Sequence, residues 1–107
     1  GLRYEVLDKG QADLSIVFTT DAQLGQGDKY TILEDDKGVL PAGNVIFLTK
    51  QETIDAAGPD YAATIESVQE GLTEKVMQEL DARVDLDKQQ PADVAHDYLV
   101  ASGYIEE

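Results

Sequence analysis

The sequence predicts a single α/β domain in which about three strands precede three C-terminal helices. Three observations lead to this prediction. Apolar and polar residues alternate over residues 13–18, as in a strand with one buried face. Residues 45–48 form a continuous apolar run, which is typical of a strand covered on both faces. From Tyr61 onward, apolar residues recur at helical spacing, so helices follow the strands.

The first elements can be assigned in order along the chain. Leu2, Val6 and Leu7 fall at helical spacing, and Gly10 stands where the C-terminal cap of a helix belongs. The strand over residues 13–18 follows this helix after a short turn. A helix, a glycine and a strand in succession form half of an α/β unit, so we expect a partly parallel sheet.

The middle of the chain supplies the other two predicted strands. Residues 22–29 hold two glycines and little apolar material, which indicates a loop or one short helical turn. Residues 30–34 form the second strand, and residues 35–38 have the composition of a turn. Residues 39–44 contain a proline and a glycine, which predicts an irregular connection to the third strand at 45–48.

The second half of the chain predicts helices only. A short helical segment over Gln51–Ala57 comes first. Pro59 stands at a first helical position, and the helix that it opens ends at Gly71. Thr73 is the expected N-cap of the following helix. A last helix begins at Pro91 and stops at Gly103.

Charge and composition exclude several classes of partner. The 107 residues include 22 acidic and 8 basic ones, for a net charge of −14, which argues against nucleic acids and anionic membranes. The absence of cysteine excludes disulfides and thiolate metal sites. Because the chain begins with Gly1 inside a predicted helix, we expect a fragment of a longer protein.

The polar residues do not form a recognisable catalytic or metal-binding set. An EF-hand loop that starts at Asp85 fails, since glutamine stands at its fifth and sixth positions. The acidic cluster at residues 34–36 is better explained by a turn than by acid/base catalysis. His96 is the only histidine and has no sequence context for a triad or a zinc site. We therefore expect no enzyme, no metal and no cofactor.

The most informative stretch is residues 12–21, where the first predicted strand ends in Phe18, Thr19, Thr20 and Asp21. A buried strand that runs into hydroxyls and a carboxylate is a common way for an α/β sheet to present a ligand site. It is also a common way for a strand to stop. The pattern alone leaves both interpretations open.

Several short motifs, taken in order, resemble one family. They are residues 1–4 with Gly10 and residues 12–13, residues 18–21, residues 33–38 with 41–42 and 44–45, and the helical tail at 72–73, 77, 80, 82–85, 91–95, 98–99 and 103–104. Together they resemble the C-terminal part of the substrate-binding proteins of ABC importers for glycine betaine, choline and related compatible solutes.

This resemblance implies a fold, a ligand and a partner. The fold would be part of a type II periplasmic-binding-protein fold, two α/β lobes with the ligand in the cleft and a crossover near residues 34–44 of this chain. The protein would bind a small quaternary-ammonium or zwitterionic solute for osmoprotection and would dock on an ABC permease outside the cytoplasm. That place would be the periplasm or the cell surface, as a lipoprotein or a permease-fused domain. A fragment could also form a strand-exchanged homodimer.

The resemblance also assigns roles to individual residues. Phe18 would be a wall of an aromatic cage, because ring faces hold methylated cations that have no hydrogen-bond donors. Thr19, Thr20 and Asp21 would be polar groups at the cleft edge, and Asn44 a crossover contact. The alternatives are a core role for Phe18 and a turn-capping role for Asp21.

Two departures from the family pattern concern the cage. Many members carry tyrosine where this chain has Phe18, and many carry Pro-Pro-Tyr where it has Pro41, Ala42 and Gly43. A different class of function also stays open at this point, namely a ligand-sensing or interaction module that reuses the fold without transport.

Overall fold

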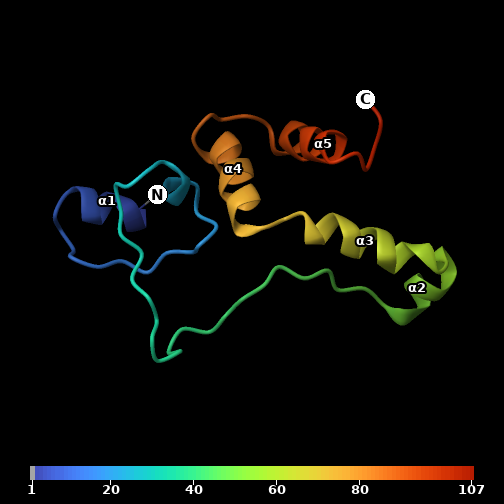
Figure 1. The fold of residues 1–107 in the computed structure, drawn as a ribbon, viewed down its shortest axis with the longest axis horizontal. Helices are drawn as coiled ribbons and strands as arrows, with labels where there is room; N and C mark the ends of the chain where they lie inside the picture. The colour runs from blue at the N-terminus through green and yellow to red at the C-terminus, as the bar shows by residue number, and fades with distance from the viewer. Residues whose placement is uncertain (1) are drawn as a thin grey trace.

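The computed structural model describes residues 2–107 and consists of helices joined by extended and turn segments (Figure 1). The elements in chain order are α1 (Leu2–Asp8), the 3-10 turn η1 (Ala22–Gly25), α2 (Gln51–Ala57), α3 (Asp60–Glu70), α4 (Glu74–Asp85) and α5 (Pro91–Ala101). No strand forms among the described residues. The helices therefore carry all of the regular structure in residues 2–107.

The ends of the helices follow from local chemistry. The predicted N-cap Thr73 and the predicted start of the last helix at Pro91 are confirmed, whereas Pro59 is the N-cap of α3 and not its first helical residue. At the end of α1, Gly10 adopts a φ of 62° and its N–H donates to the carbonyl of Leu7 at 3.0 Å. At the start of α4, the Thr73 hydroxyl accepts a hydrogen bond from the Val76 N–H at 3.3 Å. These caps satisfy backbone groups that have no partner inside the helix.

The prediction of about three strands, and with it the α/β fold class, is wrong for this chain. Residues 13–18, 30–34 and 45–48 are extended or irregular but pair with no neighbour. Their apolar side chains lie in solvent: Leu14 and Ile16 are each 72% exposed, and Leu48 is 93% exposed. A strand is stabilised by hydrogen bonds and side-chain pairs across to a second strand, and no such partner lies beside these segments among residues 2–107.

The absence of strands among the described residues also bears on the expected strand-exchanged homodimer. Exchange between two copies needs a strand that one copy can offer to the sheet of the other. Residues 2–107 contain neither the strand nor the sheet. The structure therefore gives this dimer no support.

The chain is much less compact than an ordinary domain of its length. Its radius of gyration is 17.5 Å, and its principal extents are 54 × 36 × 19 Å, whereas a globular chain of this size has a radius of about 13 Å. In Figure 1, η1 lies beside α4 and α1 lies farther from it, while residues 31–50 run as a long connection to α2 and α3. Among the described residues only Tyr4, Ala22 and Val94 are buried hydrophobic residues.

Two tyrosines fasten the C-terminal segment to the end of α3. The Tyr98 hydroxyl donates to the carbonyl of Val68 at 3.0 Å, and the Tyr104 hydroxyl donates to the carbonyl of Ser67 at 2.6 Å. Both carbonyls belong to the last turns of α3, where carbonyls run short of helical partners. Gly71 lies against Tyr98, and a Cβ at this position would stand 2.3 Å from the Tyr98 hydroxyl oxygen.

The predicted crossover region contains a turn organised by one carboxylate. The Asp35 side chain accepts hydrogen bonds from the backbone N–H groups of Leu40 at 2.6 Å and Val39 at 3.0 Å. These bonds lower the pKa of the Asp35 carboxyl. Gly38 completes the turn with a φ of 60°. Asp35 therefore has a structural role here, as expected for a turn rather than for acid/base catalysis.

Candidate ligand-binding site

Residues 18–21 form a turn that is held by the carboxylate of Asp21. Oδ2 of Asp21 accepts hydrogen bonds from the Tyr4 hydroxyl at 2.8 Å and from the Phe18 backbone N–H at 3.3 Å. The same oxygen lies 3.8 Å from the guanidinium of Arg3. The Asp21 N–H in turn donates to the Phe18 carbonyl at 3.0 Å. Asp21 thus connects the 18–21 segment to α1.

Tyr4 keeps its proton in this arrangement. Burial raises the pKa of the Tyr4 hydroxyl well above its usual range, and the hydrogen bond to the Asp21 carboxylate raises it further. A protonated hydroxyl is the donor that the carboxylate requires. The contact between α1 and the 18–21 segment therefore persists across the physiological pH range.

Phe18 lies at the surface, not in a core. The residue is 65% exposed, and the Arg3 guanidinium sits 4.8 Å from the centre of its ring. A cation at this distance from a ring face is attracted by the ring quadrupole. The ring of Phe18 is therefore presented so that it can accept a positive charge, and the core alternative does not hold for this chain.

The structure assembles only part of the predicted site. Thr19 is exposed, Thr20 is half-buried, and Asp21 stands at the N-cap position of η1 without a side-chain capping bond. Asn44 belongs to the segment 31–50, which runs away from the N-terminal part of the chain toward α2 (Figure 1). The four residues at 18–21 are together, and Asn44 does not join them.

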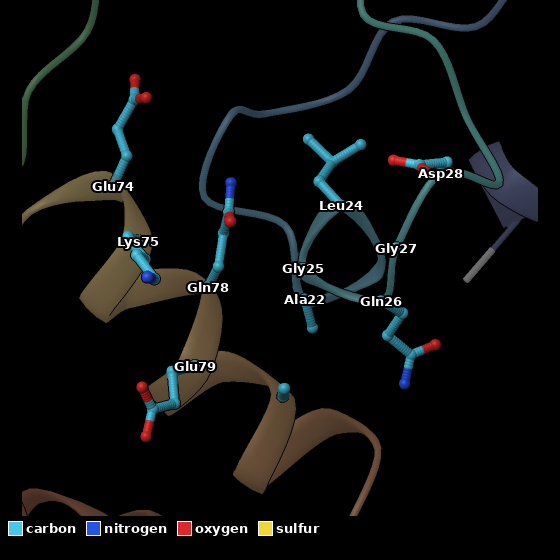
Figure 2. A pocket seen from close by; sticks show the side chains of 11 residues that line it. Ala22, Leu24, Gly25, Gln26, Gly27, Asp28, Glu74, Lys75, Gln78 and Glu79 are labelled. Atoms are coloured by element: carbon cyan, nitrogen blue, oxygen red, sulfur yellow. The ribbon is translucent and has the colours of Figure 1, made fainter.

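Helix α4 packs against η1. It contacts the 18–21 segment in addition to the contacts from α1. The Gln78 side chain donates from Nε2 to the carbonyl oxygen of Thr19 at 2.5 Å. Figure 2 shows Gln78 projecting from α4 beside η1. A groove of about 690 Å³ follows this contact. Its lining residues are Ala22, Leu24, Gly25, Gln26, Gly27, Asp28, Glu74, Lys75, Gln78, Glu79 and Ala82.

Several carboxylates lie where α4 approaches the 18–21 segment. Burial raises the pKa of Asp81, and the charges of Asp85 and Asp21 raise it further. The charge of Asp21, in the candidate site, thus acts on Asp81 of α4. An excess of carboxylates makes the local potential negative, which attracts cations and repels anions in general.

Sequence reasoning missed three residues that shape the site. Arg3, Tyr4 and Gln78 contact the 18–21 segment from 15 to 59 positions away in the chain. The helical spacing noted for α1 concerned Leu2, Val6 and Leu7, but in the structure Leu2 is 78% exposed and Tyr4 is buried. The tyrosine within the first turns of α1 was the available signal, since a tyrosine combines a large apolar body with a polar tip.

The described residues contain no ready-made metal-binding cluster. No cluster of three or more His, Asp or Glu side chains in residues 2–107 has an arrangement that could hold a metal ion. The exposed aromatic ring, the backbone carbonyls and the carboxylates are suited to binding a small solute. These features are those of a candidate ligand-binding site.

The comparison with protein families agrees with this class. Residues 1–101 match the family described as the substrate binding domain of ABC-type glycine betaine transport systems. The chain belongs to this family, which confirms the resemblance found in its sequence. Because the family consists of substrate-binding proteins and not of enzymes, membership also confirms the prediction of a non-enzymatic chain.

Two curated relatives extend this result. The chain is 36% identical over 99 residues to a glycine-betaine-binding protein of Pseudomonas aeruginosa, covering 92% of this chain and 31% of that protein. It is 31% identical over 102 residues to an ergothioneine transport permease/ergothioneine binding protein of Helicobacter pylori, covering 95% of this chain and 18% of that protein. The chain thus spans less than a third of the length of each of these two relatives. No solved structure matches it significantly.

The helices of the structure are short. Within residues 2–107, none combines the length and the apolar character needed to cross a bilayer.

Proposed function

We propose that this chain forms part of the substrate-binding protein of an ABC importer and helps bind a quaternary-ammonium or zwitterionic solute. Glycine betaine and choline are the leading candidates. Family membership supports a substrate-binding role in compatible-solute transport. The observation that carries the ligand class is the Arg3 guanidinium, a cation lying 4.8 Å from the centre of the largely exposed Phe18 ring.

In this proposal the ring of Phe18 receives the ammonium end of the solute. A methylated ammonium has no N–H donors, so attraction to a ring face replaces hydrogen bonding. Thr19, Thr20 and Asp21 supply polar groups at the same edge. Asp21 acts mainly by shaping the turn, because its carboxylate is already engaged by Tyr4 and by the Phe18 N–H.

Asn44 enters the site through lobe closure in this proposal. The chain is a single part of a two-lobe protein, with the crossover near residues 34–44. Closing the two lobes around the solute brings the crossover toward the 18–21 segment. The closed, loaded protein then docks on a permease subunit outside the cytoplasm, in the periplasm or at the cell surface.

Calorimetry on the full translated protein that contains this chain tests the ligand claim. The titrants are glycine betaine, choline, carnitine, ergothioneine and proline. We expect binding of at least one methylated ammonium compound. Absence of binding for all of them would refute the ligand class.

A pair of phenylalanine variants tests the role of the ring. Phe18→Leu removes the ring face, and the loss of a cation–π contact of about 0.5–2 kcal/mol weakens binding roughly 2- to 30-fold. Phe47→Leu is the matched control, because Phe47 is 63% exposed but lies outside the proposed site. Equal dissociation constants for the two variants would remove Phe18 from the site.

A further inference from the structure

We infer that Gln78 of α4 is a positioning residue that fixes the 18–21 segment and thereby sets the affinity for the solute. The inference rests on the proposed function, since it concerns the same site. Gln78 does not itself contact the solute in this account. It acts on the segment through the hydrogen bond from its Nε2 to the Thr19 carbonyl, which joins residues 59 positions apart.

The packing around Gln78 leaves this contact little freedom. A Cβ built on Gly25 would lie 3.6 Å from the Cβ of Gln78, so η1 and α4 approach closely beside the hydrogen bond. Ala22, the first residue of η1, is only 1% exposed. The buried Ala22 and the bonded Thr19 carbonyl hold the segment on both sides of Thr20 and Asp21. Figure 2 shows Gln78 and Gly25 next to each other.

The 18–21 segment is thus held from two directions. Tyr4 of α1 holds the Asp21 side chain, and Gln78 of α4 holds the Thr19 backbone. If the bond to Gln78 is lost, the contact with Tyr4 remains. The segment then loosens without detaching. A binding site that is ordered before the ligand arrives loses less entropy on binding, so loosening weakens affinity.

Three substitutions separate hydrogen bonding from packing. Gln78→Met keeps the length of the side chain and removes the donor. Gln78→Glu keeps the length and places a carboxylate opposite the Thr19 carbonyl. Gln69→Met is the matched control, because Gln69 on α3 also donates from Nε2 to a backbone carbonyl, that of Val45, at 3.3 Å.

The first measurement needs no ligand. Amide hydrogen exchange, read by NMR, reports on the Asp21 N–H, which is bonded to the Phe18 carbonyl. We expect Gln78→Met and Gln78→Glu to speed its exchange about 3- to 10-fold, the equivalent of one ordinary hydrogen bond. Gln69→Met should leave the Asp21 amide unchanged. Unchanged exchange in Gln78→Met would overturn the inference.

The second measurement is the affinity for the tightest-binding solute in calorimetry, with the thermal midpoint recorded beside it. We expect Gln78→Met to weaken binding about 3- to 10-fold while Gln69→Met does not. Faster exchange with an unchanged dissociation constant would limit Gln78 to a structural role and overturn the inference. If the wild-type protein binds no solute, the proposed function fails, and hydrogen exchange still decides whether Gln78 positions the segment.

Discussion

The contact between Gly71 and Tyr98 gives a prediction that can be worked out atom by atom. In the variant Gly71→Ala, the new methyl group would lie 2.3 Å from the Tyr98 hydroxyl oxygen. The hydroxyl would have to retreat by about 1 Å to reach the 3.4 Å of an ordinary contact. That movement breaks its 3.0 Å hydrogen bond to the Val68 carbonyl.

The expected cost is about 1–3 kcal/mol of unfolding free energy. Crowding of a packed site costs about 1–3 kcal/mol and a lost hydrogen bond about 0.5–1.5 kcal/mol. The backbone contribution to the free energy of unfolding has the opposite sign. Gly71 has a φ of −74°, which alanine adopts easily, so the substitution itself gains about 0.4–1 kcal/mol.

The variant Tyr98→Phe tests whether the hydroxyl of Tyr98 is what opposes a side chain at position 71. Without the hydroxyl, the nearest Tyr98 atom to the new methyl group is the ring carbon Cζ, at the ordinary distance of 3.5 Å. Gly71→Ala should then be neutral or stabilising by up to about 1 kcal/mol. The double-mutant cycle should therefore give a coupling of about 1–4 kcal/mol, the difference between the effects of Gly71→Ala in the two backgrounds.

Urea unfolding followed by far-ultraviolet circular dichroism measures all four proteins of the cycle. Gly43→Ala is the control, because no other atom lies within 4 Å of a Cβ at that position. Equal destabilisation by Gly71→Ala in both backgrounds would refute the reasoning. It would mean that the hydroxyl of Tyr98 is not the obstacle.

Two further predictions concern carboxylates. Burial and the nearby charge of Asp85 raise the pKa of Asp81, so ionised Asp81 destabilises the folded state. Asp81→Asn should therefore raise the free energy of unfolding at neutral pH and leave it unchanged below the ordinary pKa of 3.8. Urea unfolding at the two pH values measures this difference. Hydrogen bonds from Lys29 and Tyr30 lower the pKa of Asp8, so its contribution is present above pH 3.8 and is lost as the pH falls through the lowered value. Lys29→Met should bring the pKa of Asp8 back toward 3.8 in an NMR titration, and an unchanged pKa would contradict the ion pair.

Local chemistry made the helices predictable from the sequence. Thr73, Pro91 and the glycines at positions 10 and 103 set helix ends through residues only a few positions away. Strand pairing has no such local cause. The alternation at residues 13–18 correctly excludes a helix, but a ladder also requires a partner segment that only the three-dimensional arrangement can supply.

In the candidate site, too, the local features could be predicted from the sequence and the long-range contacts could not. The resemblance drew attention to residues 18–21, which lie together because they are neighbours in the chain. The contacts that hold them come from Arg3, Tyr4 and Gln78, and no periodicity or motif connects these residues to the segment. Asn44 was placed in the site by family analogy, and the structure leaves it on the extended segment 31–50.

The exposed apolar run at residues 45–48 has a consequence for solubility. Such a segment, uncharged and rich in β-branched and aromatic residues, is prone to stacking with copies of itself. The net charge of −14 opposes this through repulsion between molecules. Repulsion weakens as salt shortens its range to about 8 Å at physiological ionic strength, and it vanishes near the isoelectric point of about 4.1. The net charge of this chain therefore opposes its self-association through residues 45–48.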